Sequence, residues 1–590
     1  MDVDPETPVA VPPSAPRWRK RWRTHWRGLA LVAALVIAVW SIAASLIGVY
    51  QFWDVGTNSW FDRLMGGGDS RRAAAVIAAD RFGDQLRDVV YLSQNWNPAD
   101  SIWFYNTTQG SDLLPYDFFM VLERPGSTEL VRSNENMDSY RYLPQNKTIS
   151  NPDGLAVGFV KDTYAGTEYV GLTCAACHTG QLNYNGIGYR IDGGPSGADM
   201  KLFIEDLGAA LRATEDDPGV QERFVKAVAA RGQYANEDAI RADLTRYRQR
   251  ISRYAEINGS STAYGYFRLD AFGRIYNRVL EHVMNAPALL SVLNQMVIDG
   301  RITAAQRQAI CQCSGNDAPP EVYSDEDRDA VYDRVEKTLA VPQWKMLRDR
   351  VYNRANAPVS YPFLWDIPQH DYVQWNGLAA NAGLGPVGRN TGEAIGVFGT
   401  LDWSSKFGWS LSSLISGQGF KGTHISFKSS VNVRNLGRIE THLTTLESPQ
   451  WPKEFPPIDT ARADRGRVVF ASYCVGCHSE INRADPERRV VAHLSRLSEI
   501  GTDPRMASNG VNYSGLSGIL RNQYVNAGVG DILIDQGAPV AALLTKATLS
   551  VIATPDPDKN LLWRGFEWGY DLLASLFSND IKASLKHGNY

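Results

Sequence analysis

Two copies of the pattern Cys-x-x-Cys-His constrain this 590-residue chain more than any other feature, one at 174–178 and one at 474–478. Two thiols at this spacing add to the two vinyl groups of a haem, and the adjacent imidazole reaches the iron, so the pattern is typical of c-type haem attachment. A redox disulfide and half of a zinc site are the alternatives. Neither requires a histidine directly after the second cysteine in both copies of the pattern. We therefore expect two covalent haem c groups, with attachment and iron-ligand residues Cys174, Cys177, His178, Cys474, Cys477 and His478.

The two motif histidines lie 300 residues apart, whereas a small haem domain needs only about 100 residues. The fold class predicted is mainly α, with two cytochrome c-like haem domains that carry long loop-rich insertions, preceded by one transmembrane helix. The predicted segments are a basic cytoplasmic tail at 1–27, a transmembrane anchor at 28–50, an N-terminal cap region at 51–150, the first haem domain at 151–345, a loop-rich connection at 346–455 and the second haem domain at 456–590.

An uncharged apolar run covers 28–50 and follows a tail that carries six basic and three acidic residues. A helix of this length crosses a bilayer of about 30 Å, and the positive-inside rule keeps the tail in the cytoplasm. The sequence thus predicts a single-pass protein of the bacterial inner membrane with most of the chain in the periplasm. A cleaved signal peptide is the alternative, although its apolar core is usually shorter.

Composition narrows the function classes. A hydrophobic fraction of 44% argues against a disordered chain, and a net charge of -4 argues against a nucleic-acid partner. Apolar residues at helical spacing predict helices over 200–214 and 272–284. Another helix is expected directly before the second motif, where Gly466 and Phe470 share a face and predict a close helix crossing.

Beyond the motifs, the chain resembles the bacterial di-haem cytochrome c peroxidase superfamily, and within it the branch of rubber oxygenases and di-haem fatty-acid dioxygenases. The phrases that carry the resemblance are VGLTCAACHTGQ (170–181), IDGGP (191–195), FRLDAFGRIYNRV (267–279), YPFLWDIPQHDYVQWNG (361–377), GRNTGEAIGVFG (388–399) and IGTDPRMASN (500–509). They cover the chain from about residue 150 to its end.

The resemblance implies an oxidoreductase of peroxidase or dioxygenase type. Its N-terminal haem, at His178, would activate peroxide or O2 beside an apolar residue, for which the position of Phe272 is the match. An ordinary helix-core position is the alternative for Phe272. The C-terminal haem, at His478, would exchange electrons with a redox partner protein, and a lipid-like substrate is expected. An electron-transfer cytochrome without substrate chemistry and a non-catalytic remnant are the other readings.

The C-terminal end departs from the resemblance. Relatives take a distal ligand of the second haem from a stretch beyond the point where this chain stops, at Ser584–Tyr590. The second haem domain is therefore expected to be truncated, with its sixth iron position open or filled by Met506 or His587. A thioether ligand such as Met506 would raise the reduction potential relative to a second histidine.

Overall fold

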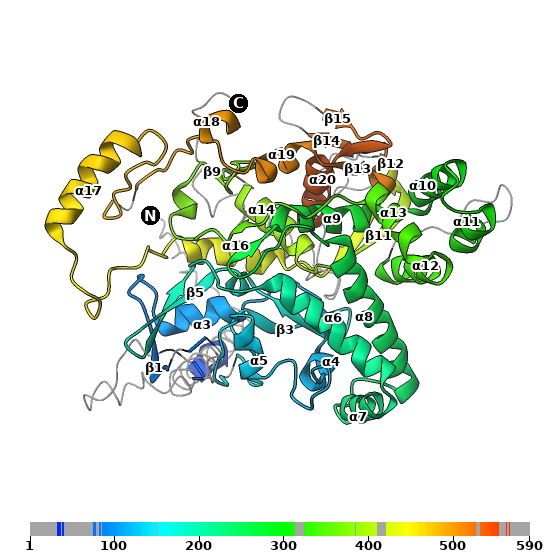
Figure 1. The fold of residues 1–590 in the computed structure, drawn as a ribbon, viewed down its shortest axis with the longest axis horizontal. Helices are drawn as coiled ribbons and strands as arrows, with labels where there is room; N and C mark the ends of the chain where they lie inside the picture. Colours follow the sequence, from blue (N-terminus) through cyan, green and yellow to red (C-terminus); the bar gives the residue numbers. More distant parts are fainter. Residues whose placement is uncertain are drawn as a thin grey trace, which may run out of the picture. The chain divides into compact units, whose positions relative to one another are not determined.

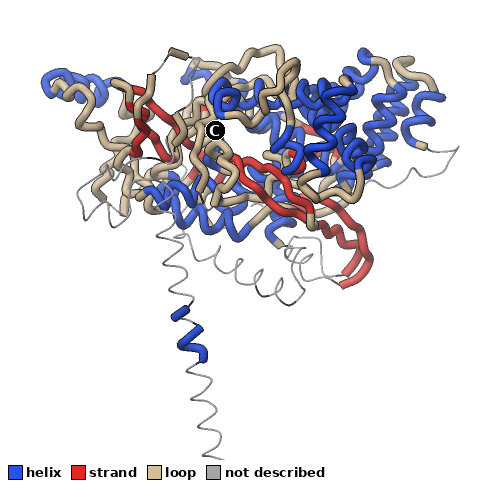
Figure 2. The backbone as a smooth tube through the Cα atoms, turned by 90° about the horizontal axis from the view of Figure 1, so that it is seen from below, coloured by secondary structure: helices blue, strands red, loops and turns tan. Residues whose placement is uncertain are grey.

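The computed structural model describes residues 85–148, 150–312, 324–383, 385–409, 421–485, 487–526 and 531–553, with shorter pieces at 32–36, 38–39, 73, 75–77, 82–83, 562 and 566. The chain divides into two units, Met1–Ser70 and Arg71–Tyr590. Every element named below belongs to the second unit, which combines helices with seven small sheets among the described residues (Figures 1 and 2).

The predicted transmembrane helix has to be corrected. Within the described residues, no helix has both the length and the apolar character needed to span a bilayer. Of the run 28–50, the structure describes only 32–36 and 38–39, which are helical, and the rest lies outside the described residues. The anchor in the predicted fold class and the inner-membrane location derived from it are therefore not supported.

Two three-stranded sheets surround the first motif. In one, β1 (Asp88–Tyr91) pairs in parallel with β6 (Ile187–Asp192), which pairs antiparallel with β5 (Thr179–Tyr184). In the other, β4 (Thr167–Leu172) lies between β2 (Leu114–Pro115) and β3 (Phe159–Tyr164). The motif therefore connects the end of one sheet to the start of the other.

The residues ahead of the first motif thus form a strand and not the helix that precedes the haem of a small cytochrome c. β4 contains Thr, Tyr and Val, residue types that favour the pleated backbone. Its last residues, Val170 to Leu172, are buried. The first haem domain, predicted as mainly α over 151–345, therefore begins with a β-rich stretch at 159–192, and its helices follow from residue 200.

Both helices predicted from apolar spacing are confirmed. α6 (Met200–Asp216) begins after Asp199, whose carboxylate accepts a hydrogen bond from the Leu202 backbone N–H at 3.0 Å. α9 (Ala271–Val283) begins after Asp270, which caps the Gly273 N–H in the same way at 2.8 Å. Every residue of α9 from Phe272 to Val283 is buried, so α9 is the central helix of the unit.

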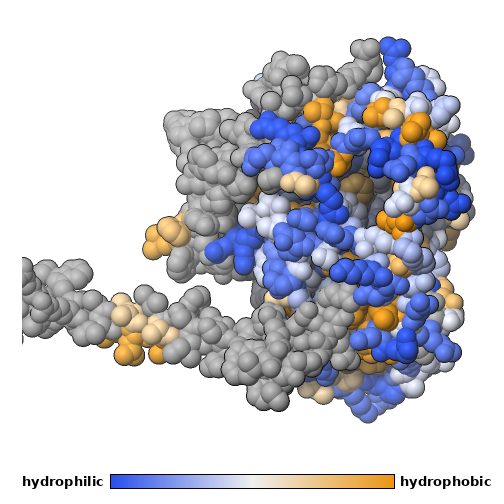
Figure 3. Space-filling model, turned by 90° about the vertical axis from the view of Figure 1, so that its left-hand side faces the viewer, coloured by the Kyte–Doolittle hydropathy of each residue, from blue (hydrophilic) through white to orange (hydrophobic). Residues whose placement is uncertain are grey.

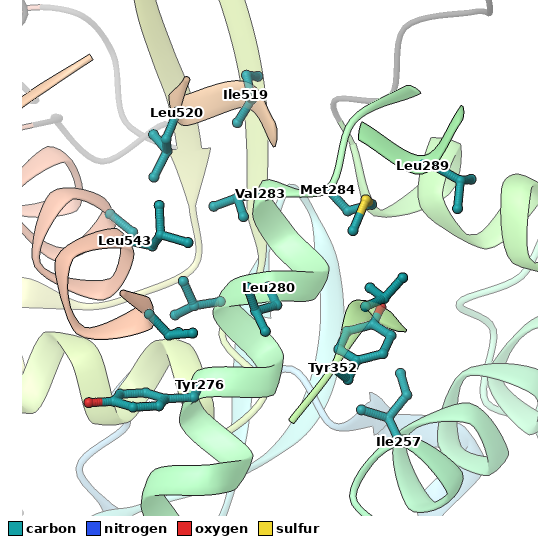
Figure 4. Close-up of a cluster of buried hydrophobic side chains, with 14 of the residues drawn as sticks. Ile257, Tyr276, Leu280, Val283, Met284, Leu289, Tyr352, Ile519, Leu520 and Leu543 are labelled. Carbon is teal, nitrogen blue, oxygen red and sulfur yellow. The ribbon is translucent and has the colours of Figure 1, made fainter. Parts of the chain in front are cut away.

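The largest hydrophobic cluster forms around α9 (Figure 4). Tyr276, Leu280 and Val283 of α9 are completely buried and meet Leu543 of α20 (Val540–Ile552) and the chain around Leu520. Removing a side chain of this kind costs about 2–5 kcal/mol. Because α9 also begins at the wall of the first motif's cavity, described below, this cluster fixes one side of the site.

Next to that cluster lies a buried network of ion pairs. Arg253 of α8 (Glu237–Ile257) pairs with Asp329 of α12 (Asp325–Thr338) at 2.6 Å and with Glu281 of α9 at 3.3 Å. Arg278 completes it with a bond of 2.6 Å to Glu281. The network ties three helices together through charges that have little access to water.

The remaining elements complete the unit. The other helices are α3 (Pro98–Asn106), α4 (Tyr116–Val121), α5 (Asn134–Ser139), α7 (Pro218–Ala229), α10 (Ala286–Ile298), α11 (Ala304–Cys311), α13 (Val341–Val351), α14 (Gly385–Gly396), α16 (Val433–Leu443), α17 (Thr460–Tyr473), α18 (Leu497–Ile500) and α19 (Arg505–Asn512). Short 3-10 turns lie at η1 (Cys174–Ala176), η2 (Ile367–Gln369) and η3 (Gly518–Leu520). The remaining strands pair as β7 (Arg268–Leu269) with β8 (Val359–Ser360), β9 (Tyr372–Val373) with β10 (Ala379–Ala380), β11 (Leu401–Trp409) with β12 (Lys421–Ser429), β13 (Ser514–Leu516) with β16 (Gly537–Pro539), and β14 (Tyr524–Asn526) with β15 (Asp531–Leu533).

Candidate functional site

The first motif folds as a tight turn. The backbone N–H groups of Cys177 and His178 both donate to the Cys174 carbonyl, at 3.3 and 3.0 Å. Gly158 allows the turn to pack closely: its φ is +86°, and a Cβ there would lie 2.2 Å from the Ala176 backbone nitrogen. The turn brings Cys174, Cys177 and His178 to the wall of one cavity, as the attachment chemistry requires.

The His178 imidazole has a defined orientation. Its Nδ1 lies 2.8 Å from the Pro362 carbonyl oxygen, so Nδ1–H donates there and the lone pair of Nε2 is left for a metal. Burial lowers the pKa of His178 to about 4, against the opposing effect of the Pro362 hydrogen bond. The ring is therefore neutral near pH 7, which is the form that binds iron.

The two thiols next to it are uncharged as well. Burial raises the pKa of Cys174 and of Cys177 to about 12, and the nearby Glu393 carboxylate contributes to both shifts. The motif thus presents two neutral thiols and one neutral imidazole toward the same space.

That space, which we call the Phe272 cavity, has a volume of about 150 Å³. Phe272 of α9 lines it and is 9% exposed, so this predicted distal residue does lie at the same cavity as His178. The Phe272 ring meets Tyr276 edge-on at 5.8 Å, which holds the ring from behind. Most of the other walls are apolar, including Leu269, Ile275 and Tyr361.

A second cavity of about 330 Å³, the motif-bridging cavity, lies next to the first and shares several wall residues with it. These common residues are Cys174, His178, Pro362, Gln374, Trp375 and Glu393. Its wall also contains Cys477 of the second motif and His493. The fold therefore brings the two motifs to one cavity, a relationship that their separation along the chain did not predict.

Three polar residues of these cavities were missed by the sequence reasoning. Glu393 of α14 lines both cavities, and burial raises the pKa of its carboxyl while Arg389 opposes the shift. Arg274 and Gln374 line the Phe272 cavity, and Arg274 Nε and Nη1 and Gln374 Oε1 are buried without a hydrogen-bond partner. The signal in the sequence was that all three fall in phrases that carry the resemblance, at 267–279, 361–377 and 388–399.

Arg389 itself is engaged. It pairs with Glu440 of α16 and donates at 3.0 Å to Asn381 Oδ1. A buried guanidinium that is already paired with a carboxylate has little free capacity for a second anion.

The second motif repeats the turn of the first. Cys477 and His478 donate their backbone N–H groups to the Cys474 carbonyl at 3.1 and 2.9 Å. The preceding helix α17 is confirmed, yet none of its residues is buried. Figure 1 shows α17 at the edge of this unit. On the face that Figure 3 turns to the viewer, apolar side chains lie among hydrophilic ones.

The predicted close helix crossing at Gly466 is wrong for the described residues. A Cβ built at Gly466 would meet nothing within 4 Å, because no described element packs against this face of α17. Exposed apolar side chains surround the motif instead: Val468, Val469, Tyr473 and Val475. Exposed apolar surface beside two thiols and an imidazole fits an apolar prosthetic group better than bulk water.

Met506 lies elsewhere than the prediction implied. It starts the helix α19 and lines the Phe272 cavity, together with His178. It does not line the motif-bridging cavity that contains Cys477. The other predicted sixth ligand, His587, lies outside the described residues.

The predicted metal binding is also corrected for side-chain clusters. Across the part of the chain that the structure describes, no group of three or more His, Cys, Asp or Glu side chains is placed to hold a metal ion. The physical reason is that each motif supplies a single imidazole.

Comparison with known proteins adds one relative. The chain is similar to a protein of Sinorhizobium fredii (strain NBRC 101917 / NGR234) whose name is "Uncharacterized protein y4iJ", with 26% identity over 478 residues. The match covers 71% of this chain and 65% of that protein, and the relative's name assigns no activity. No family model and no solved structure matches the chain. Function therefore has to be argued from the site.

Proposed function

We propose that this protein is a di-haem c-type oxidoreductase of peroxidase or dioxygenase type. Cys174, Cys177 and His178 would hold one haem, and Cys474, Cys477 and His478 the other. The observation that carries the proposal is the first motif, where two thiols and a neutral imidazole with a free Nε2 line one cavity.

A haem bound at His178 would supply an iron atom that can bind a small oxidant such as peroxide or O2. The iron can also gain or lose one electron. The protein supplies the rest. The Pro362 carbonyl accepts a hydrogen bond from the Nδ1–H group of His178. This bond fixes the orientation of the ring and increases the electron density at Nε2. Phe272 and the neighbouring apolar side chains exclude water from the other side of the cavity.

Two features favour substrate chemistry over simple electron transfer. The Phe272 cavity is mainly apolar, which suits a lipid-like substrate beside the haem. The Glu393 carboxyl, with its raised pKa, can hold a proton at the edge of the same cavity. A cytochrome that only carries electrons has no use for either feature.

The second motif suits the exchange of electrons. Cys477 is exposed on one side and lines the motif-bridging cavity on the other. A haem at this position would lie between a surface that a redox partner can approach and the cavity that also contains Cys174.

Haem counting tests the attachment. We expect two covalently bound haems per chain, and one each in the Cys174→Ala/Cys177→Ala and Cys474→Ala/Cys477→Ala variants. His442, which belongs to neither motif, provides the control, because His442→Ala should keep both haems. Fewer than two haems in the unaltered chain would contradict the proposal.

Low-temperature EPR of the oxidised protein tests the chemistry. An open iron position at His178 gives a high-spin signal that disappears in the Cys174→Ala/Cys177→Ala variant and persists in the other one. Two low-spin haems, both in the resting protein and after reduction and reoxidation, would indicate an electron carrier and contradict the peroxidase or dioxygenase activity.

A further inference from the structure

A third cavity, the Arg190 pocket, is lined in part by residues of the paired strands β5 and β6. Its volume is about 230 Å³. No residue that lines it also lines the Phe272 cavity or the motif-bridging cavity. The pocket is therefore a separate site in this unit.

A buried cation with a free donor forms the wall of this pocket. Arg190 of β6 is 2% exposed. Its Nε donates to Gln181 Oε1 at 2.9 Å and its Nη2 to the Pro144 carbonyl at 3.1 Å, but its Nη1 has no partner. Leaving such a donor unpaired away from water costs more free energy than an ordinary hydrogen bond contributes to stability. We therefore expect a bound molecule to accept a hydrogen bond from Arg190 Nη1.

The sheet aligns a second free donor with it. In the antiparallel pair of β5 and β6, Gln181 lies opposite Arg190, and Thr179 precedes Gln181 by two residues on the same face. The Thr179 hydroxyl is buried and also has no partner. Arg190 Nη1 and Thr179 Oγ1 are thus two unused donors in one wall.

The other charged groups of the pocket have interactions of their own. The Arg141 guanidinium lies over the Phe82 ring at 3.1 Å from its centroid. Asp138, the carboxylate of the pocket, is engaged as well. Asp192 lies two residues from Arg190, but its carboxylate accepts from Ser101 at 2.6 Å and from Tyr105, and it makes no ion pair with Arg190. The positive charge of Arg190 is consequently left without a contacting anion.

Apolar side chains form another part of the wall. Val76, Leu86, Val89, Leu143, Leu182 and Phe267 line it. Gly197 lies at the edge, where a Cβ would come within 3.2 Å of the Arg141 Cβ and 3.4 Å of the Phe267 Cζ. A larger side chain at this position would close the space between Arg141 and Phe267.

We propose that the Arg190 pocket binds a small carboxylate with an apolar body. The carboxylate oxygens would accept from Arg190 Nη1 and Thr179 Oγ1, and the hydrocarbon part would lie against the leucine and valine side chains. Two donors satisfy one carboxylate, whereas a phosphate would keep most of its oxygens unpaired against apolar walls.

Calorimetric titration of the full-length, haem-loaded protein with hexanoate tests the proposal, with hexan-1-ol and inorganic phosphate as matched probes. We expect saturable binding of one hexanoate per chain, and at least about tenfold weaker binding of the other two, because each lacks either the charge or the apolar body. Absence of hexanoate binding would overturn the proposal, which includes the case in which a carboxylate of a bound haem already fills the pocket. Equal binding of phosphate or of the alcohol would overturn it too.

Two variants locate the site. Arg190→Gln removes the charge, and Gly197→Val narrows the mouth without touching the donors; each should weaken hexanoate binding at least about tenfold. Lys345→Ala removes an exposed charge elsewhere and should leave it unchanged. If Arg190→Gln does not fold, Gly197→Val decides alone, and unchanged binding in that variant would place hexanoate elsewhere and overturn the proposal.

Discussion

Cys174 and Cys477, one from each Cys-x-x-Cys-His motif, line the same cavity. The chain between them folds into the α8–α13 helices and the β11–β12 hairpin and then returns the second motif to the first. Groups attached at the two motifs would therefore affect each other's charge.

Redox titration should detect this coupling. The haem that is reduced second in the unaltered protein is expected to have a lower midpoint potential than the same haem alone, because an electron added nearby disfavours the next one. At short range in a protein the effect is on the order of tens of millivolts. The single-haem variants Cys174→Ala/Cys177→Ala and Cys474→Ala/Cys477→Ala provide the comparison, and identical potentials with and without the partner haem would contradict the shared cavity.

Gly158 and Gly166 form a matched pair for testing the first motif. Both have positive φ, but a Cβ at Gly158 would collide with the Ala176 backbone, whereas one at Gly166 would meet nothing within 4 Å. Gly158→Ala should therefore reduce haem attachment at the first motif, measured as bound haem per chain. Gly166→Ala introduces only the strain of a non-glycine residue at positive φ, which costs on the order of 1 kcal/mol, and no collision. This variant should therefore keep both haems. Equal haem content in the two variants would show that the close approach at Gly158 is not needed.

The core around α9 predicts a stability difference. Leu280 is completely buried in the largest cluster, and Leu280→Ala should lower the free energy of unfolding by about 2–5 kcal/mol, measured by urea denaturation. Val468 on α17 is 68% exposed, and Val468→Ala should change the free energy by no more than about 0.5 kcal/mol. Similar losses in the two variants would contradict the burial described for α9 and α17.

The buried ion network makes stability depend on pH. Desolvation raises the pKa of Asp329 and Glu281, but the arginines around each outweigh it, so both folded-state pKa values lie below their ordinary values of 3.8 and 4.5. A carboxylate with a lowered folded-state pKa contributes stability above its unfolded pKa and loses it as the pH falls through the folded one. The free energy of unfolding should therefore be steady near neutral pH and fall below about pH 4.5.

Arg253→Met isolates this contribution. It removes one partner of each carboxylate, while Arg278 still pairs with Glu281 and Arg250 with Asp329, and should cost at most about 3–5 kcal/mol at pH 7. It should cost less at pH 3, because the carboxyl groups become protonated. Lys226→Ala, which breaks an exposed pair with Glu222, should have little effect at either pH. A loss in Arg253→Met that is equally large at both pH values would contradict the assigned pairing.

Local signals in the sequence predicted the parts of the fold that depend on local residues. Apolar spacing identified α6 and α9, and the helix expected before the second motif is α17. The strand β4 precedes the first motif, where pairing with β2 and β3 stabilises its β-branched and aromatic residues.

Long-range relationships in the site could not be predicted in this way. Met506 was assigned to the second haem from its position along the chain, but it lines the cavity of the first motif. Glu393 and Pro362 come to His178 from segments far away in the sequence, and no local pattern marks a backbone carbonyl as a hydrogen-bond acceptor. The unused donors of Arg190 and Thr179 depend on the register of β5 against β6.

The exposed helix α17 has a consequence for the making of this protein. A helix with no buried residue gains no stability from packing, so its turns open easily and offer their peptide bonds to proteases. An apolar group attached at Cys474 and Cys477 would give Val468, Val469 and Tyr473 a surface to pack against. Attachment would then cover this segment, and chains without the attached group should be cleaved there more readily by proteases.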